Sequence, residues 1–383
     1  MSSNGEKVTV ILPTLNESDR VRGVMDAVAQ SPLVSNLIVA DGHSVDDTVS
    51  VAKKVGHRLP IDFEVVQSKF RHTGKGAAMI AGIEAALKYK NPICFFDSDI
   101  ASITPEWVEK IALPVIGGEV DMCRGFYDRA RDDALITKHI TRPLLALYFP
   151  ELTHIRQPLG GELTLTSELA SKLLGGFAPT HSWGIDTWLL IQASLSGAGI
   201  KEVYLGEKIH RPKDLVDLAS MIKECFREVV ENASHASRLR HRQATFHLGP
   251  LPEFDSNARR IRVISPVMLE ENIRFGIGIK VDSLDRLSHA KLFETTLAAS
   301  EISAFKLNVG AIGQKEWIRT LHELACLYLK GEKVLPLVYK LWIVYSSGYI
   351  LRSTHSFREA EDYVDEQCKT AFEMRKELLG GVK

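Results

Sequence analysis

The sequence of 383 residues lacks any large excess of one charge. It has 47 lysine and arginine residues against 48 aspartate and glutamate residues, so its net charge is −1. Holding a nucleic-acid backbone requires many uncompensated cations, and the balance therefore argues against nucleic acid as the partner. With 45% hydrophobic and 25% charged residues, the composition is that of a folded globular protein rather than a disordered one.

The sequence also lacks the patterns of secretion, membrane insertion and thiolate metal binding. Its N-terminus has neither the basic start nor the apolar stretch of a signal peptide. The most apolar late segment, Leu341–Leu351, is too short to cross a bilayer of about 30 Å, and is expected to be a buried helix. The five cysteines are widely spaced and form no CxxC pair. We therefore expect reduced thiols in a cytoplasmic protein that does not associate with membranes.

Apolar runs alternate with helical patterns through the first half of the chain. The runs typical of buried strands are Val8–Leu12, Asn36–Ala40, Phe63–Val66 and Ile93–Phe96. Strands that alternate with helices in this way predict a mainly parallel sheet, whose ligand site lies at the carboxyl ends of the strands. Ser44 is the expected N-cap of the helix that follows the second run.

The second half of the chain is different, because the pattern becomes helical almost to the end beyond Asp214. A further helix is expected from about Asp132 to Leu147. The predicted fold class is therefore α/β, with a sheet domain at residues 1–215 and a C-terminal helical domain at residues 216–383.

Two acidic residues and a histidine are candidate metal ligands. Asp97-Ser98-Asp99 directly follows the fourth apolar run, and carboxylates at this spacing can share one divalent cation. His210 lies just past a later predicted strand, and a neutral imidazole suits a magnesium or manganese site as a further ligand. The ordinary alternatives are a solvated turn for the acids and a surface or hydrogen-bonded histidine.

Several glycines stand where a backbone could approach a ligand. Gly74-Lys75-Gly76 at a helix start could offer backbone N–H groups and a lysine to a phosphate, although it is not a P-loop. Gln157–Glu162 contains two adjacent glycines that remove side-chain bulk, and an ordinary turn is the alternative.

Other polar residues suit a sugar or a small acid. Asp186, at the start of a predicted helix, is either a helix-start acid or an acceptor for sugar hydroxyls. Arg129 and Thr137 lie on either side of Asp132-Asp133 and could bind a small acid, because a guanidinium matches a carboxylate bidentately. A surface arginine is the alternative.

Taken in order, these motifs resemble those of GT-A glycosyltransferases. The motifs that carry the resemblance are Pro13–Glu17, Asp41–Thr48, Gly74–Gly76, Asp97–Asp99 and His210. Three more narrow it to the retaining transferases that glycosylate glycerate or 3-phosphoglycerate: Gln157–Glu162, Trp183–Thr187 and Ile209–Arg211. The stretch Arg124–Thr137 looks closer to mannosylglycerate synthase than to glucosyl-3-phosphoglycerate synthase.

The resemblance implies a metal-dependent, retaining hexosyltransferase with a GT-A nucleotide-sugar-binding domain. It would transfer a hexose, with mannose favoured, to D-glycerate and form a compatible solute. The implied donor is GDP-mannose, with GDP-glucose or UDP-glucose as alternatives, and the implied cofactor is Mg²⁺ or Mn²⁺. A homo-oligomer is compatible with it. The alternatives are a glucosyl-3-phosphoglycerate synthase and, in another class, a non-catalytic sugar-nucleotide-binding protein.

The resemblance also implies roles for individual residues. Asp99 and His210 bind the metal, Asp186 orients the sugar, and Leu159 and Gly160 supply loop backbone at the reacting centre. The residues that contact the nucleotide-sugar are Pro13, Leu15, Glu17, Asp41, Gln67, Lys75, Asp97 and Ser98. The residues that contact the acceptor are Arg129, Thr137 and Lys213. Lys213 beside the metal histidine could also bind a phosphate, which leaves acceptor phosphorylation open.

Overall fold

The computed structural model describes residues 7–70, 74–210, 215–235, 245–251, 264–282, 284–299, 301–352 and 356–380. The chain divides into two compact units. The sheet unit comprises Met1–Asp128 and Gln157–Pro212, and the helical unit comprises Arg129–Arg156 and Lys213–Lys383. This division differs from the single boundary expected after residue 215, because Arg129–Arg156 belongs to the helical unit and the chain enters that unit twice.

The sheet unit is built on one mainly parallel sheet, as the alternating pattern predicts. Its seven strands have the order β3-β2-β1-β4-β6-β5-β7. β1 pairs in parallel with β2 and β4, β2 with β3, and β5 with β7, whereas the short β6 is antiparallel to both β4 and β5. The strands are β1 (Val8–Thr14), β2 (Val34–Asp41), β3 (Asp62–Gln67), β4 (Ile93–Phe95), β5 (Met122–Asp128), β6 (Leu163–Leu165) and β7 (Ile200–Glu207).

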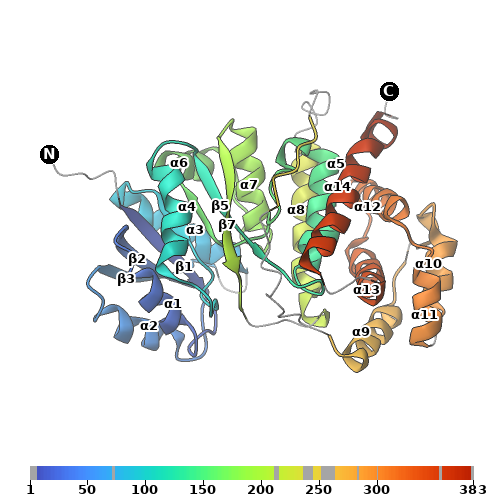
Figure 1. Cartoon of the computed structure of the whole chain (residues 1–383), viewed down its shortest axis with the longest axis horizontal. Coiled ribbons are helices and arrows are strands. Elements are labelled where there is room, and N and C mark those ends of the chain that lie inside the picture. The colour runs from blue at the N-terminus through green and yellow to red at the C-terminus, as the bar shows by residue number, and fades with distance from the viewer. Residues whose placement is uncertain are drawn as a thin grey trace. The chain divides into compact units, whose positions relative to one another are not determined.

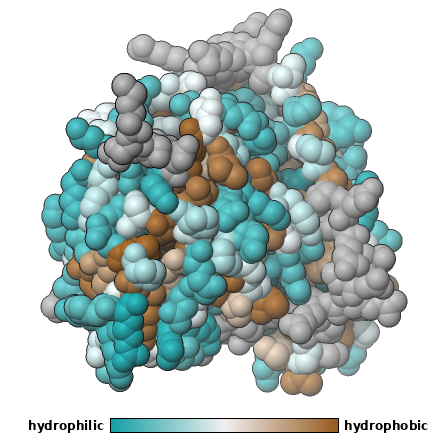
Figure 2. All heavy atoms as spheres, turned by 60° about the vertical axis from the view of Figure 1, so that its left-hand side comes forward, coloured by the Kyte–Doolittle hydropathy of each residue, from teal (hydrophilic) through white to brown (hydrophobic). Residues whose placement is uncertain are grey.

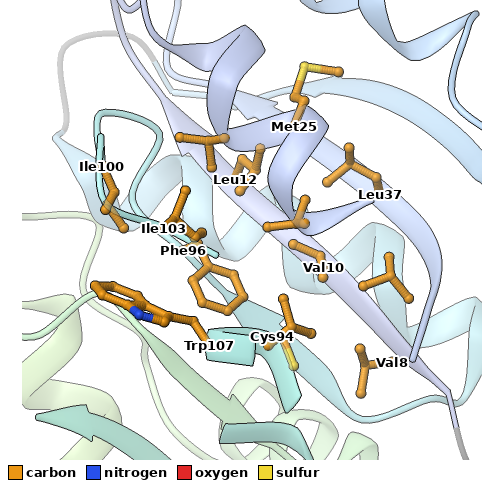
Figure 3. Close-up of a cluster of buried hydrophobic side chains, with 14 of the residues drawn as sticks. Val8, Val10, Leu12, Met25, Leu37, Cys94, Phe96, Ile100, Ile103 and Trp107 are labelled. Atoms are coloured by element: carbon orange, nitrogen blue, oxygen red, sulfur yellow. The ribbon is translucent and has the colours of Figure 1, made fainter. Parts of the chain in front are cut away.

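Helices cover both faces of this sheet (Figure 1). Side chains alternate along a strand, so Val8, Val10 and Leu12 of β1 enter the apolar cluster of Figure 3, whereas Ile11 enters the cluster on the opposite face. The first cluster includes residues of α1, α2 and α4, and the second includes residues of α3, α6 and α7. The helices are α1 (Val21–Val28), α2 (Thr48–Gly56), α3 (Lys75–Ala86), α4 (Pro105–Ile116), α6 (Ser167–Gly176) and α7 (Ile185–Leu195).

The N-cap expected for α2 is wrong, because the helix begins at Thr48, three residues later than an N-cap at Ser44 would place it. The Asp46 carboxylate accepts hydrogen bonds from the backbone N–H of Thr48 at 3.0 Å and from its hydroxyl at 2.5 Å. The Ser44 hydroxyl instead accepts a bond from the Asn16 N–H at 2.9 Å. Ser44 therefore joins the loops that follow β1 and β2, both of which end at the predicted ligand edge.

Helices are the regular elements of the helical unit, and its described residues contain no strand. The single helix expected from about Asp132 to Leu147 is a π-helical turn at Thr137–Thr141 followed by α5. The apolar segment Leu341–Leu351 lies in α13, which is buried along most of its length, as expected. The helices are α5 (Arg142–Tyr148), α8 (Ala219–His235), α9 (Pro266–Gly278), α10 (Ala290–Leu297), α11 (Ile302–Val309), α12 (Gln314–Leu329), α13 (Leu335–Arg352) and α14 (Phe357–Gly380).

A buried group of charges joins α14 to α5, which lie side by side in Figure 1. The Arg142 guanidinium contacts Glu361 at 2.8 Å and Asp365 at 2.5 Å. Arg156 contacts Asp365 at 2.7 Å and Glu361 at 3.3 Å. Two cations thus balance two carboxylates, so none of these buried charges is left without an opposite charge.

No helix in the described ranges has both the length and the apolar character needed to cross a membrane. The face shown in Figure 2 is mostly hydrophilic, and hydrophobic residues lie between the hydrophilic ones. All the cysteines are free thiols, in agreement with the expectation from their spacing.

Candidate active site

The predicted nucleotide-binding residues gather at one edge of the sheet unit. They follow the carboxyl ends of neighbouring parallel strands, which meet at the same edge. Pro13, Leu15 and Glu17 belong to the end of β1 and the loop after it, Asp41 and Gln67 end β2 and β3, and Asp97 and Ser98 follow β4. The Ser98 hydroxyl donates to the Pro13 carbonyl at 3.0 Å, whereas the Leu15 side chain is 46% exposed.

Asp41 organises the loops at this edge. Its carboxylate is buried and accepts hydrogen bonds from the backbone N–H groups of His43 at 3.1 Å and Ser44 at 3.0 Å. The side-chain amide of Gln67 donates to the same carboxylate at 3.0 Å. Glu17 is tied to the start of α2, because its N–H donates to the Thr48 hydroxyl at 2.8 Å. The ends of β2 and β3 are thus joined through the Asp41 carboxylate.

Lys75 stands between two carboxylates. Its ammonium lies 2.8 Å from Asp97 Oδ1 and 3.1 Å from Asp186 Oδ2. Burial lowers the pKa of Lys75, but the carboxylates of Asp186 and Asp97 outweigh it and raise that pKa above its ordinary value. Burial opposes the ionisation of Asp97, yet Lys208 and Lys75 hold its pKa well below the usual range. Burial raises the pKa of Asp186, against the attraction of Lys75.

The glycine loop is held against these charges by a buried arginine. Arg124 of β5 donates to the carbonyls of Pro158 at 3.1 Å and Gly160 at 2.8 Å. The Gly160 N–H donates to the Gln157 carbonyl at 2.9 Å, and Leu159 at the turn is only half-buried. A Cβ on Gly161 would lie 2.2 Å from Asp97 Oδ1, so this position needs glycine for close approach.

The glycines at the start of α3 have a different use from the one predicted. The N–H groups of Gly76 and Ala77 donate to the carbonyls of Ser182 at 3.1 Å and His181 at 3.1 Å. A Cβ on Gly76 would lie 2.5 Å from the Thr180 carbonyl oxygen. These N–H groups therefore bond the loop before α7 instead of a phosphate. The group that this segment can present to a ligand is the Lys75 side chain.

The acids after β4 suit a divalent cation. Burial and the nearby negative charge of Asp99 both raise the pKa of Glu17, so carboxylates crowd together at this point. Carboxylate oxygens are ligands that Mg²⁺ and Mn²⁺ accept, and a cation here would relieve the repulsion. His210 follows Ile209, whose carbonyl accepts a 2.7 Å bond from the Ala101 N–H, so its segment is bonded to the loop that carries Asp99.

Among the described residues, no three histidine, cysteine or acidic side chains form a metal-binding group. The predicted metal site needs only two protein ligands, Asp99 and His210. Asp97 faces the ammonium groups of Lys75 and Lys208 instead.

The predicted acceptor residues lie in the helical unit. Arg129 contacts the Asp133 carboxylate at 2.8 Å, and Thr137 is buried at the start of the π-helical turn. The buried ammonium of Lys138 donates to the Ala130 carbonyl at 2.6 Å and the Arg131 carbonyl at 3.3 Å. Lys138 therefore braces the loop that carries Arg129. Lys213 lies outside the described residues.

Sequence reasoning assigned no role to four buried side chains beside Asp97 or the glycine loop: Arg124, Tyr127, Glu162 and Lys208. Lys208 bridges Asp97 and Glu162 at 2.8 Å each, and Tyr127 donates to Glu162 at 2.5 Å. The available signal was an arginine and a tyrosine inside the apolar strand β5, and a lysine directly before Ile209-His210. Charged residues in a strand buried on both faces indicate paired partners, but the partners are distant in sequence.

Known proteins resemble this chain over most of its length. The family model described as "Mannosylglycerate synthase, GT domain" matches residues 21–231. The glucosyl-3-phosphoglycerate synthase of Mycolicibacterium smegmatis is 33% identical over 234 residues, which cover 57% of this chain and 75% of that protein. The mannosylglycerate synthase of Selaginella moellendorffii is 28% identical over 366 residues, covering 90% of this chain and 83% of that protein.

A solved structure supports the same relationship. The glucosyl-3-phosphoglycerate synthase of Mycobacterium tuberculosis, in complex with Mn²⁺, uridine diphosphate and glucosyl-3-phosphoglycerate, matches with a TM-score of 0.53 and 30% identity. The match covers 61% of this chain and 81% of that chain. Together with the family match and the sheet order, these relatives show that the chain belongs to the mannosylglycerate synthase family and is a glycosyltransferase of GT-A fold.

Proposed function

We propose that this enzyme transfers a hexose, with mannose favoured, from a nucleoside-diphosphate sugar to D-glycerate, with retention at the anomeric carbon. The observation that carries the proposal is the charge arrangement after β4. Asp97 and Asp186 share Lys75, Asp99 lies nearby, and the loop containing Gly160 is held beside them. Such a site offers a cation, carboxylates for sugar hydroxyls, and close backbone approach in one place.

The donor half of the site follows from these residues. We infer that Asp41 and Gln67 receive the nucleotide, since they lie at adjoining strand ends and already share a hydrogen bond of 3.0 Å. Lys75 brings positive charge to the diphosphate. GDP-mannose is the proposed donor, because the similarity to the Selaginella mannosylglycerate synthase covers 90% of the chain. GDP-glucose and UDP-glucose are the alternatives that the test below distinguishes.

Asp99 and His210 would hold a divalent cation, Mg²⁺ or Mn²⁺. Several solved structures of the Mycobacterium tuberculosis glucosyl-3-phosphoglycerate synthase contain Mn²⁺, and another contains Mg²⁺. When bound, such a cation stabilises the negative charge that develops on the departing nucleoside diphosphate.

The chemistry at the sugar is assigned to few groups. Asp186 is buried and held by Lys75, so it can orient sugar hydroxyls as an acceptor. The backbone of Leu159 and Gly160 approaches the reacting centre. The glycerate hydroxyl forms the new bond to the anomeric carbon on the face from which the diphosphate leaves, and its proton passes to the departing phosphate oxygen. No protein nucleophile is required by this scheme.

The acceptor is proposed to be glycerate rather than 3-phosphoglycerate. Arg129 can bind a carboxylate bidentately and Thr137 can add a hydroxyl. Asp133 offsets the charge of Arg129 at 2.8 Å, and Lys138 turns its ammonium toward backbone carbonyls. A phosphate brings roughly −1.5 to −2 further charge and needs cations of its own. Lys213 could supply one, so 3-phosphoglycerate is retained as the alternative acceptor.

A matrix of donors and acceptors tests the proposal. GDP-mannose, GDP-glucose, UDP-mannose and UDP-glucose would each be offered with D-glycerate and with 3-phosphoglycerate, in the presence of Mg²⁺ or Mn²⁺. The product and its anomeric configuration would be identified by NMR, and EDTA would serve as the control. The expected product is α-mannosylglycerate from GDP-mannose. Higher catalytic efficiency with 3-phosphoglycerate would instead establish the alternative acceptor.

Two further proposals concern the setting of the reaction. We place it in the cytoplasm, because the chain keeps free thiols where an oxidising compartment favours disulfides. A homo-oligomer is compatible with the family, and sedimentation would decide it.

A further inference from the structure

A buried cluster in the sheet unit surrounds Asp97, and we name it the Lys208 cluster after its central residue. The Lys208 ammonium lies 2.8 Å from Asp97 Oδ2, 2.8 Å from Glu162 Oε1 and 2.9 Å from Glu162 Oε2. It also lies 4.9 Å from the centre of the Tyr127 ring, and the Tyr127 hydroxyl donates to Glu162 at 2.5 Å. The Lys208 side chain is 3% exposed and that of Glu162 is fully buried.

The backbone beside Lys208 is joined to the loop after β4. The Ile209 carbonyl accepts a hydrogen bond from the Ala101 N–H at 2.7 Å. The Ile209 N–H donates to the Ser102 hydroxyl at 2.9 Å. Ile209 directly precedes His210, so one end of the segment carrying the histidine is fixed against this loop.

The two sets of bonds bracket the predicted metal ligands. Asp97 is held by Lys208 through its side chain, and Ala101 is held through its backbone, so Asp99 lies midway between two fixed points. In the segment after β7, His210 directly follows Lys208 and Ile209, which these bonds fix. The separation of the Asp99 and His210 segments is therefore set by the Lys208 cluster together with the bonds at Ile209.

Stability alone does not account for such a cluster. Burying an ion pair costs desolvation that the attraction repays only in part, and apolar residues of similar volume often stabilise a protein as well or better. What apolar residues would not do is hold one carboxylate oxygen at a fixed place. Groups that orient metal ligands from behind typically change metal affinity about 10–100-fold when they are lost.

We propose that Lys208 is a positioning residue, which with Glu162 and Tyr127 holds the Asp97 loop and the His210 segment at the separation that a divalent cation requires. The inference rests on the proposed function, since it takes Asp99 and His210 as the ligands. Lys208 contacts neither metal nor substrate in this role. Its loss should weaken cation binding.

The test uses the full chain and measures Mn²⁺ binding directly. The main variant is the double substitution Lys208→Met with Glu162→Gln, which removes both charges and so avoids a buried carboxylate without its cation. Binding would be followed by electron paramagnetic resonance of free Mn²⁺, with GDP or UDP present. The double variant should bind Mn²⁺ about 10–100-fold more weakly than wild type. Lys208→Arg should stay within about threefold, because the guanidinium keeps the charge.

A matched control comes from the same strand. Lys201 of β7 pairs with Glu119 at 2.6 Å, but its side chain is 41% exposed and the pair lies away from the acids after β4. Lys201→Met should leave Mn²⁺ affinity unchanged. Circular dichroism and thermal unfolding would establish that each variant is folded.

A second variant tests the inference if the double variant does not fold. Ser102→Ala removes the acceptor for the Ile209 N–H at a half-buried position, and should weaken Mn²⁺ binding about two- to tenfold. Wild-type Mn²⁺ affinity in a folded double variant, or in Ser102→Ala when the double variant does not fold, would overturn the inference.

Wild-type protein separates this inference from the proposed function. If the wild-type protein fails to bind Mn²⁺ both in the presence of GDP and in the presence of UDP, the metal site is absent and the inference is wrong. If it binds Mn²⁺ but forms no hexosylglycerate, the proposed reaction fails, whereas the weaker binding of the double variant would still support Lys208 as a positioning residue.

Discussion

Adding one methyl group to Gly161 should separate the charges that hold the donor site together. A Cβ at this position would lie 2.2 Å from Asp97 Oδ1 and 2.6 Å from Lys75 Nζ. No such contact is tolerable, so one side chain must move. Asp97 is held from behind by Lys208 at 2.8 Å, whereas Lys75 has a long and flexible side chain. We therefore expect Lys75 to move in Gly161→Ala, and its 2.8 Å contact with Asp97 to be lost.

The size of the effect follows from that contact. A charge-assisted hydrogen bond contributes about 1.5–3 kcal/mol. Each 1.36 kcal/mol of transition-state stabilisation corresponds to a factor of ten in rate. If Lys75 can no longer stand at the diphosphate, kcat/KM for the donor should fall about 10- to 150-fold. The fall should be larger for the donor than for the acceptor, because the Lys75 contacts lie in the sheet unit.

Steady-state kinetics with GDP-mannose and D-glycerate would measure it. Gly175→Ala is the matched control, since Gly175 lies in α6 of the same unit and a Cβ there would meet no atom within 4 Å. Both variants should retain the circular dichroism spectrum of the wild type. If Gly161→Ala had the donor efficiency of Gly175→Ala, the close approach of the loop to Lys75 and Asp97 would have no part in donor binding.

Three further predictions concern the metal, the acceptor and stability. Asp99→Ala and His210→Ala should each abolish most turnover in metal-buffered assays while thermal unfolding stays near wild type, and full activity in either would refute the ligand assignment. Arg129→Ala should lose about ten- to a hundredfold in kcat/KM for glycerate, measured at saturating donor, because a charge-assisted bond is lost. Burial lowers the pKa of His139 from 6.5 to about 3. Between these pH values only the unfolded chain binds the proton, so the free energy of unfolding decreases as the pH is lowered. When the pH is lowered from 7 to 4.5, the free energy of unfolding measured with urea should decrease by roughly 2.5 kcal/mol less in His139→Phe than in the wild type. An equal decrease in both proteins would contradict this account.

The sheet and its ligand edge could be predicted because their signals are local. Each strand of the first half contains a short apolar run, although β3 at the sheet edge is only half-buried where a buried strand was expected. Each strand is followed by polar residues that the parallel arrangement brings to one edge. Asp41, Gln67 and Asp97 therefore lie in the structure at the strand ends where the sequence places them. The start of α2 was wrong because the Ser44 hydroxyl bonds the Asn16 N–H of the loop after β1, a distant partner, and the helix begins only after Asp47.

The Lys208 cluster and the unit boundary could not be predicted, because they depend on distant partners. Lys208 meets Glu162, 46 residues away, and Asp97, 111 residues away, and no window of the sequence contains them together. Likewise, the helical pattern near Arg142 gives no indication that its guanidinium pairs with Glu361. That contact, 219 residues apart, is one of those that place Arg129–Arg156 in the helical unit.

The charges around Lys75 also explain in physical terms why a cation is needed. The ion pairs that link these side chains contain two ammonium groups, Lys75 and Lys208, against three carboxylates, Asp97, Asp186 and Glu162. The two positive charges are therefore already more than balanced before a diphosphate arrives. The N–H groups at the start of α3 add little, because they are bonded to the carbonyls of the loop before α7. Lys75 alone therefore brings too little net positive charge for the departing diphosphate, and a divalent cation is the group that supplies the rest.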